Sequence, residues 1–326
     1  MQGIDREITA NYGLEVRSIM PYKDTQILYT DRGRKILKKM MFSPERILFI
    51  HGAKEHLVRN GFINVDRYLP TLKGEPHFCF DNANYIVFDL IEGSECNFDN
   101  DIEVRQAAVL LASLHSASKG YKSMDGAKLQ DELGKLPTYF NKRLDDIKKL
   151  RKNAKKGKSG FDHVFLDHVD YFIGIGEQAV SELEKSNYPC LVNEARDNGV
   201  FCHHDFTHHN IISSGNMFSV INFDYCCFEL KIYDLANLIR RKMRKCNWDM
   251  DKAKLIIDGY ASVEQLSKDE FAVMKLILQF PQKFWRVVNR YYNSRRSWSE
   301  RSFIVKLQEV VDEVEGHSKF IDSYNF

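Results

Sequence analysis

One segment, FCHHDFTHHNIISSGNMFSVINFDYC at residues 201–226, gathers most of the side chains that could do chemistry. Residues 211–212 and 220–221 are β-branched pairs, which favour two short strands. Gly215-Asn216 between them is typical of a two-residue hairpin turn. The segment is therefore predicted to be a β-hairpin that carries histidines, carboxylates and amides at its open end.

That turn also predicts the strand register. Residues whose numbers sum to 431 lie opposite each other when the turn is at residues 215–216. Asn210 then faces Ile221, and Asn222 and Asp224 emerge beside it. We expect Asn222 and Asp224 to share one strand face, because side chains alternate along a strand.

The histidines of the segment, at positions 203, 204, 208 and 209, suggest a metal site as one interpretation. Such a site needs ligands on a rigid frame and a second set elsewhere, and the chain has no complementary His or Cys cluster. A metal-dependent phosphohydrolase would instead use His204-Asp205 as a dyad on helices, whereas here a strand leads in and a hairpin leads out. Both interpretations fit less well than phosphoryl transfer.

Phosphoryl transfer needs a carboxylate that accepts the proton of the attacking hydroxyl, and oxygen ligands that hold Mg²⁺ against nucleotide phosphates. Asp205, Asn210 and the pair Asn222/Asp224 follow each other in that order. The pattern H-x-D-x-x-x-x-N followed by I-[DN]-F-[DE] resembles the aminoglycoside phosphotransferase and choline kinase superfamily, which shares the protein-kinase-like fold. The finer resemblance is to its spore coat protein S (CotS) family.

The finer resemblance extends over most of the chain. Its most specific parts are HHDFTHHN, INFDYC and YDLANLIRR at 233–241. Looser support comes from ILKK at 36–39, EHLVRNGF at 55–62, LASLHSASKGY at 111–121, PQKFWRVVNRYY at 281–292 and RRSW at 295–298.

The resemblance implies a role for each matching position. Asp205 looks like the catalytic base, Asn210 like a Mg²⁺ ligand, and Asn222 and Asp224 like further metal ligands. Lys38, on the second strand of the small lobe, looks like the lysine that grips the nucleotide phosphates. The implied cofactors are ATP and Mg²⁺.

Other positions would support this site. The ion-pair partner of Lys38 is expected on a helix at 44–60, where Glu55 borders the apolar stripe and Glu45 is already explained by the helix dipole. The segment Asp89 to Ile91 would be the hinge whose backbone meets adenine.

Two further residues are expected to have structural roles at the site. Asp234 resembles an aspartate that braces the catalytic loop, which is compatible with capping a helix from Leu235. His203 is interpreted as a bracing residue of the loop and not as a catalyst.

Two departures from the family pattern are expected to weaken the binding of Mg²⁺ and of the nucleotide phosphates. Asn222 occupies the position of the principal metal-binding aspartate, and a neutral amide is a poorer ligand than a carboxylate for Mg²⁺. The loop MPYKDTQ at 20–26 contains no glycine, so nothing in it marks a loop that cradles phosphates.

The composition is that of an ordinary globular protein. The chain has 326 residues, 44% hydrophobic and 28% charged, with a net charge of +2. Such a balance gives no reason to expect nucleic acid or a membrane as the main partner. The polar start MQGIDREITANYG suggests no signal peptide, and seven cysteines without a C-x-x-C pair indicate reduced thiols in a cytosolic compartment.

The elements that must position the site follow from local patterns. Residues 27–40 read as two strands around an Asp-Arg-Gly turn, and 85–90 as another strand. Ser43-Pro44 opens a helix that ends near Gly61. The first ninety residues are thus strands plus one main helix, and helical periodicity dominates from Asp101 on.

Some local patterns invite other interpretations. GKSG at 157–160 lacks the earlier glycine and strand of a P-loop, and Gly174-x-Gly176 lies inside helical spacing, which favours packing over a dinucleotide site. The basic run at 142–158 is interpreted as a solvated helix and loop, with docking to an anionic partner as the alternative. Aromatic residues at 284, 285, 291, 292 and 298 are interpreted as core, with a pocket for a cationic or sugar substrate as the alternative.

We therefore expect an α+β protein with a protein-kinase-like bilobal fold. A small antiparallel-sheet lobe at 1–92 would bind nucleotide, and a mostly helical lobe at 93–326 would carry the hairpin and the substrate side. The expected function is ATP- and Mg²⁺-dependent phosphate transfer to a small hydroxyl compound. The alternative is a structural spore coat protein with little or no turnover, which would be made in the mother-cell cytosol and have other coat proteins as partners.

Overall fold

The computed structural model describes residues 3–293 and 298–326. Residues 295–297 of the RRSW motif therefore lie outside the described residues. The chain forms two compact units, one of Met1–Asp131 with Asn198–Phe228 and one of Glu132–Asp197 with Glu229–Phe326. The hairpin thus belongs to the same unit as the N-terminal strands, and the lobe boundary at residue 92 stays a prediction. Within the described residues, no helix is both long and apolar enough to cross a bilayer.

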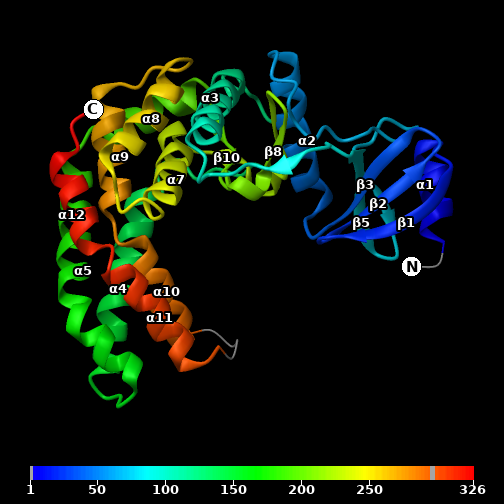
Figure 1. Ribbon diagram of the computed structural model, residues 1–326. Coiled ribbons are helices and arrows are strands. Elements are labelled where there is room, and N and C mark those ends of the chain that lie inside the picture. The colour runs from blue at the N-terminus through cyan, green and yellow to red at the C-terminus, as the bar shows by residue number, and fades with distance from the viewer. Residues whose placement is uncertain (1–2, 294–297) are drawn as a thin grey trace. The chain divides into compact units, whose positions relative to one another are not determined.

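The first unit is built on a five-stranded antiparallel sheet with the order β1-β2-β3-β5-β4 (Figure 1). The strands are β1 (Val16–Tyr22), β2 (Thr25–Thr30), β3 (Gly33–Met40), β4 (Phe78–Phe80) and β5 (Ala83–Asp89). Alternation along β3 divides its side chains between two faces. Leu37 packs into a core shared with α1 (Ile4–Tyr12), whereas Ile36 and Lys38 line a cavity.

Helix α1 was not expected, because the first ninety residues were predicted to hold only one main helix. It places Ile4, Ile8 and Tyr12 on one buried face, at a spacing of four residues. Its partners are apolar side chains of the sheet, among them Leu28 and Val87. The short polar start therefore covers one face of the sheet.

The main helix of this unit is α2 (Pro44–Arg59), which begins at Pro44 as predicted. The helix is followed by Gly61, whose φ of 87° is left-handed and suits glycine after a helix end. The rest of the unit consists of α3 (Asp101–Ser118), β6 (Ser94–Glu95), β7 (Phe201–Cys202), β8 (Ile211–Ser214), β9 (Met217–Val220), β10 (Cys227–Phe228) and the 3₁₀ turns η1 (His208–Asn210) and η2 (Phe223–Tyr225). β6, β8 and β9 form one small sheet, and β7 and β10 another.

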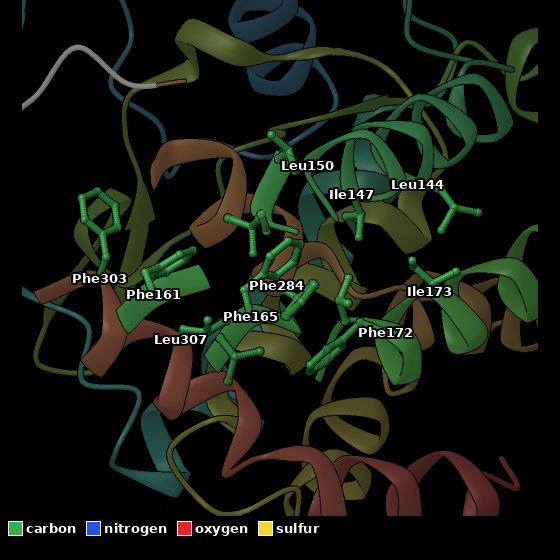
Figure 2. Close-up of a cluster of buried hydrophobic side chains, with 14 residues drawn as sticks. Leu144, Ile147, Leu150, Phe161, Phe165, Phe172, Ile173, Phe284, Phe303 and Leu307 are labelled. Carbon is green, nitrogen blue, oxygen red and sulfur yellow. The ribbon is translucent and has the colours of Figure 1, made fainter. Parts of the chain in front are cut away.

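The second unit is helical over its described residues. Its helices are α4 (Leu136–Ala154), α5 (Gly160–Lys185), α6 (Tyr188–Asp197), α7 (Lys231–Met243), α8 (Met250–Ala261), α9 (Lys268–Gln279), α10 (Gln282–Asn293), α11 (Glu300–Val311) and α12 (Val314–Ser323). Figure 2 shows the core between α4, α5, α10 and α11, where Phe284 stacks on Phe172 with ring centroids 3.9 Å apart. Trp285, Tyr291 and Tyr292 pack against this core, so the interpretation of these aromatics as core is confirmed. Trp298 is 44% exposed, so its interpretation as core is wrong.

Helix α5 explains two of the local patterns. It runs through Gly174 and Gly176 without interruption, and a Cβ on Gly176 would lie 3.1 Å from Leu144 of α4. Ser159 of the GKSG segment caps α5 together with Asp162, whose carboxylate accepts from the Ser159 N–H at 3.0 Å. Both patterns therefore have a structural role, in the packing of α5 and in the capping of its first turn.

The basic run at 142–158 covers the C-terminal part of α4 and the connection to α5. Lys148 pairs with Glu177 and Arg151 pairs with Asp170, both across to α5. Such exposed pairs contribute little to stability, but they show that part of the run is matched by acidic residues of the same unit.

Candidate active site

The hairpin of β8 and β9 has the predicted register. Ile211 pairs with Val220, and the Ile221 N–H donates to the Asn210 carbonyl at 2.9 Å. Gly215 in the turn has a φ of 62°, which glycine adopts without strain. The hairpin thus brings Asn210 and Asn222 together at its open end.

The loop between β7 and β8 is held by a buried imidazole. His203 is fully buried, and its Nε2 lies 3.0 Å from the Ile221 carbonyl. Its Nδ1 accepts from the Asp205 N–H at 3.3 Å, and its ring contacts that of Phe223 edge-on, with centroids 4.7 Å apart. His203 therefore ties the start of the loop to the end of the hairpin, which restricts the backbone of Asp205.

Five of the predicted site residues form one continuous chain of hydrogen bonds. The Asn210 amide donates to the Asp205 carboxylate at 2.9 Å, and the Asn222 amide donates to Asn210 Oδ1 at 3.3 Å. The Lys38 ammonium then donates to Asn222 Oδ1 and to the Asp224 carboxylate, both at 2.7 Å. Lys38 lies on β3, more than 180 residues from Asn222 in the chain. Tertiary folding thus brings together five residues that the sequence analysis singled out, and their roles stay predictions.

The expectation that Asn222 and Asp224 share a strand face is wrong. The strand ends at Val220, and Asn222 has a left-handed φ of 66° before the 3₁₀ turn η2. Asp224 lies within η2, and this turn places its carboxylate 2.7 Å from the Lys38 ammonium. The Arg46 guanidinium of α2 stabilises this turn by donating to the Asp224 and Cys226 carbonyls at 2.8 and 2.7 Å.

The expectation that Glu55 pairs with Lys38 is also wrong. Both oxygens of Glu55 accept from the Arg67 guanidinium at 2.6 Å. The preceding residue, Lys54, is the one that turns into the interior of the unit, because residues one apart on a helix point about 100° away from each other. Glu55 therefore lies at the edge of the apolar stripe of α2 and pairs with Arg67. The carboxylate that pairs with Lys38 is that of Asp224, on η2.

Lys54 and Asp66 are site residues that the sequence analysis missed. Lys54 is fully buried and its ammonium lies 2.7 Å from the Asp66 carboxylate and 4.0 Å from the centre of the Tyr68 ring. The other Asp66 oxygen accepts from the Asn222 N–H at 3.0 Å. Burial lowers the pKa of Lys54, and the Asp66 carboxylate opposes that shift. A signal was present, since Lys54 falls four residues after Ile50 on the buried stripe of α2.

A cavity of about 440 Å³ lies beside this chain of hydrogen bonds. Lys38, Asp66, Asn210 and Asn222 are among the polar residues that line it. The apolar residues that line it are Ile36, Phe88, Leu90, Ile91, Ile212 and Ile221. An apolar cleft with a few convergent polar groups is the usual form of a small-molecule site.

The segment predicted as the hinge lies partly at this cavity. Leu90 and Ile91 line it. The Asp89 side chain is 64% exposed and its carboxylate pairs with Lys35 of the neighbouring strand. A contact of the Asp89–Ile91 backbone with adenine stays a prediction.

Lys23, Glu95 and His209 also line the cavity. Glu95 accepts from the Lys23 ammonium at 2.5 Å, and its second oxygen lies 2.5 Å from His209 Nδ1. Ligand atoms of Glu95, His208 and His209 lie within 4.8 Å of one another. Of the four histidines, this group holds His208 and His209, whereas His203 Nε2 lies 3.0 Å from the Ile221 carbonyl.

Asp234 belongs to the second unit. It is fully buried in the first turn of α7, which begins at Lys231. Leu230 is the N-cap of this helix, so the interpretation of Asp234 as a cap for a helix from Leu235 is wrong. Its role in bracing the catalytic loop stays a prediction.

Comparison with known proteins agrees with the resemblance seen in the sequence. The model of a family described as "Spore coat putative kinase YutH" matches residues 5–324. Spore coat protein S of Bacillus subtilis (strain 168) is 27% identical over 296 residues, which cover 90% of this chain and 84% of that protein. The expected relationship to the spore coat protein family is thereby confirmed.

Solved structures agree with the expected fold. An aminoglycoside phosphotransferase from Alicyclobacillus acidocaldarius superposes with a TM-score of 0.88 at 21% identity, covering 98% of this chain and 94% of its own. Spectinomycin phosphotransferase in complex with ADP and spectinomycin has a TM-score of 0.66 at 13% identity, covering 100% and 94%. The kinase-like α+β fold is therefore confirmed.

Proposed function

The chain belongs to the spore coat YutH family, and from that membership we propose that it is an ATP- and Mg²⁺-dependent phosphotransferase acting on a small hydroxyl compound. The observation that carries the proposal is the continuous chain of hydrogen bonds from Asp205 through Asn210 and Asn222 to Lys38 and Asp224. These are the side-chain types that phosphoryl transfer requires. They lie beside a cavity of about 440 Å³.

The donor set at the end of the chain suits a hard cation. The side-chain oxygens of Asn222 and Asp224 both lie 2.7 Å from the Lys38 ammonium, so a positive charge is already stabilised between them. Oxygen ligands are those that Mg²⁺ prefers. With Asn210, these residues would hold the ion, and Mg²⁺ bound there would neutralise charge on the nucleotide phosphates.

The other proposed roles in phosphate transfer fall to side chains of the site. Asn210 bonds both the carboxylate and the carbonyl of Asp205 at 2.9 Å, which restrains the carboxylate in one orientation. Asp205 would accept the proton of the acceptor hydroxyl as the hydroxyl oxygen attacks the terminal phosphorus of ATP. The bond between that phosphorus and the bridging oxygen would break, and ADP would leave. Lys38 would bind the nucleotide phosphates, and the apolar residues that line the cavity would contact the base.

The second candidate function is that of a structural coat protein. It is favoured by Asn222, because two neutral amides at the metal position leave Mg²⁺ short of negative charge. The curated relative described above is itself a spore coat protein. Under either function we place the chain in the spore coat, with other coat proteins as partners, after synthesis in the mother-cell cytosol. The test is a thermal-shift titration with ATP, with and without Mg²⁺, since a ligand that binds only the native state raises the melting temperature.

Lys38→Met is expected to remove the stabilisation by ATP while the fold remains. The methionine keeps most of the volume but has no charge to bind phosphate. The matched control is Lys39→Met, because Lys39 is the next residue of β3 and is exposed. Equal ATP-induced shifts for Lys38→Met and wild type would move the nucleotide site elsewhere.

Substitutions on η2 separate the two candidate functions. If the protein is an enzyme, Asp224 supplies the carboxylate that Asn222 lacks, so Asp224→Ala should abolish Mg²⁺-dependent binding of ATP. Asn222→Asp should tighten that binding or change it little. Calorimetric titration of ATP with and without Mg²⁺ gives the affinities. A wild type indifferent to Mg²⁺, with dependence restored by Asn222→Asp, would support the structural coat protein instead.

A further inference from the structure

The hairpin of β1 and β2 ends over the cavity in a two-residue turn without glycine. Tyr22 pairs with Thr25, so Lys23 and Asp24 form the turn. Lys23 has a left-handed φ of 52°, a conformation that is uncommon outside glycine, asparagine and aspartate. Residues 22–25 all line the cavity. A lysine therefore stands where a glycine would be the easier residue.

The turn differs in kind from a phosphate-cradling loop. Glycine allows backbone N–H groups to approach phosphate closely. A side chain at the turn prevents that approach, but a lysine can supply a charge in its place. Among the residues that line the cavity, the lysines are Lys23 and Lys38, and Lys38 is engaged by Asn222 and Asp224.

The Lys23 ammonium is held by an acid that also lines the cavity. Glu95 lies on β6, which pairs with β8 of the catalytic hairpin. Its Oε1 accepts from Lys23 and its Oε2 contacts His209, both at 2.5 Å. Glu95 raises the pKa of Lys23, and Lys23 and His209 lower that of Glu95. Lys23 and Glu95 are thus each stabilised in their charged forms.

The pair is exposed enough to exchange partners. The side chains of Lys23 and Glu95 are 51% and 33% exposed. Exposed ion pairs contribute little to stability, whereas phosphate carries more charge than a carboxylate and accepts stronger hydrogen bonds. A nucleotide in the cavity would therefore compete with Glu95 for the ammonium.

We propose that Lys23 binds the phosphates of a nucleotide in place of a glycine-rich loop, and that Glu95 holds it when no nucleotide is bound. This inference rests on the proposed function, since it needs a nucleotide in the cavity. Its distinctive consequence is that two variants of one ion pair act in opposite directions. Removing Lys23 loses a phosphate contact, whereas removing the charge of Glu95 releases a competitor.

The test compares ATP with adenosine, which lacks phosphates, by calorimetry at low ionic strength. Lys23→Met should lower the affinity for ATP roughly tenfold, the usual scale for a charged hydrogen bond. The affinity for adenosine should stay within about twofold of that of wild type. Glu95→Gln should raise the affinity for ATP roughly two- to fivefold and leave the affinity for adenosine unchanged. Glu92→Gln is the control for Glu95→Gln, because Glu92 is 67% exposed and pairs with Arg34.

Each alternative result is distinct. If Lys23→Met lowers the affinities for ATP and adenosine equally, the Lys23–Glu95 ion pair only maintains the conformation of the β1–β2 hairpin, and the proposal fails. Weaker ATP binding in both variants would also overturn it, since Glu95 would then help rather than compete. If wild type binds ATP and Lys23→Met matches it, this inference fails alone. If wild type binds no ATP, the proposed function fails with it.

Discussion

Asp205→Asn is expected to reduce turnover by ~100-fold or more, the usual scale for loss of a general base. The amide retains an oxygen that can accept from Asn210, so the hydrogen bond at 2.9 Å can persist. ATP affinity should change little, because Asp205 lies at the other end of the chain of hydrogen bonds from Lys38, the residue proposed to bind the phosphates. Release of ADP, measured with Mg·ATP and a panel of small hydroxyl compounds, gives the rate.

The matched control for this variant is Asp125→Asn, which changes an exposed carboxylate of the same unit. Its rate should equal that of wild type. Equal rates for Asp205→Asn and wild type in an acceptor-dependent reaction would contradict the role of Asp205. Loss of ATP binding in Asp205→Asn would show instead that the carboxylate serves the nucleotide.

Lys54→Met is expected to lower the free energy of unfolding by about 3–5 kcal/mol, because removal of one partner leaves a buried charge without compensation. Asp66 is 4% exposed, so water cannot replace the ammonium that lies 2.7 Å from it. Asp66 also accepts from the Asn222 N–H, so disorder should spread to Asn222. Urea unfolding followed by circular dichroism measures the loss.

The neighbouring pair of Glu55 and Arg67 supplies the control. Arg67 is 57% exposed, so Arg67→Met should cost about 0–1 kcal/mol. The double variant Lys54→Met/Asp66→Asn should recover part of the loss, because no unpaired charge remains. A loss in Lys54→Met no larger than that in Arg67→Met would show that Asp66 is satisfied without Lys54.

The sequence by itself determined the parts of the site that depend on local patterns. The β-branched pairs and the Gly-Asn turn predict the hairpin and its register, since side-chain alternation and turn geometry act over a few residues. The spacing from Asp205 to Asn210 predicts that both lie on one loop. Ser43-Pro44 predicts the start of α2 for the same reason.

Other elements were beyond local patterns. Helix α1 is short and begins in a polar segment, and its apolar stripe is buried only because the sheet lies beside it. Isolated helices of this length are marginal in water. Its stability therefore comes from tertiary packing, which no short window of sequence records.

The choice of ionic partners was decided by the tertiary structure alone. Glu55 and Lys54 are neighbours in the chain, yet one meets Arg67 and the other Asp66, according to how α2 is rotated against the sheet. Asn222 has a left-handed φ, so the chain departs there from the direction of the strand. Lys23 forms an ion pair with Glu95, which lies 72 residues later in the chain. Coulombic attraction acts between charges wherever the chain places them. Residue types therefore predict which chemistry is available, and only the packed fold decides which charges meet.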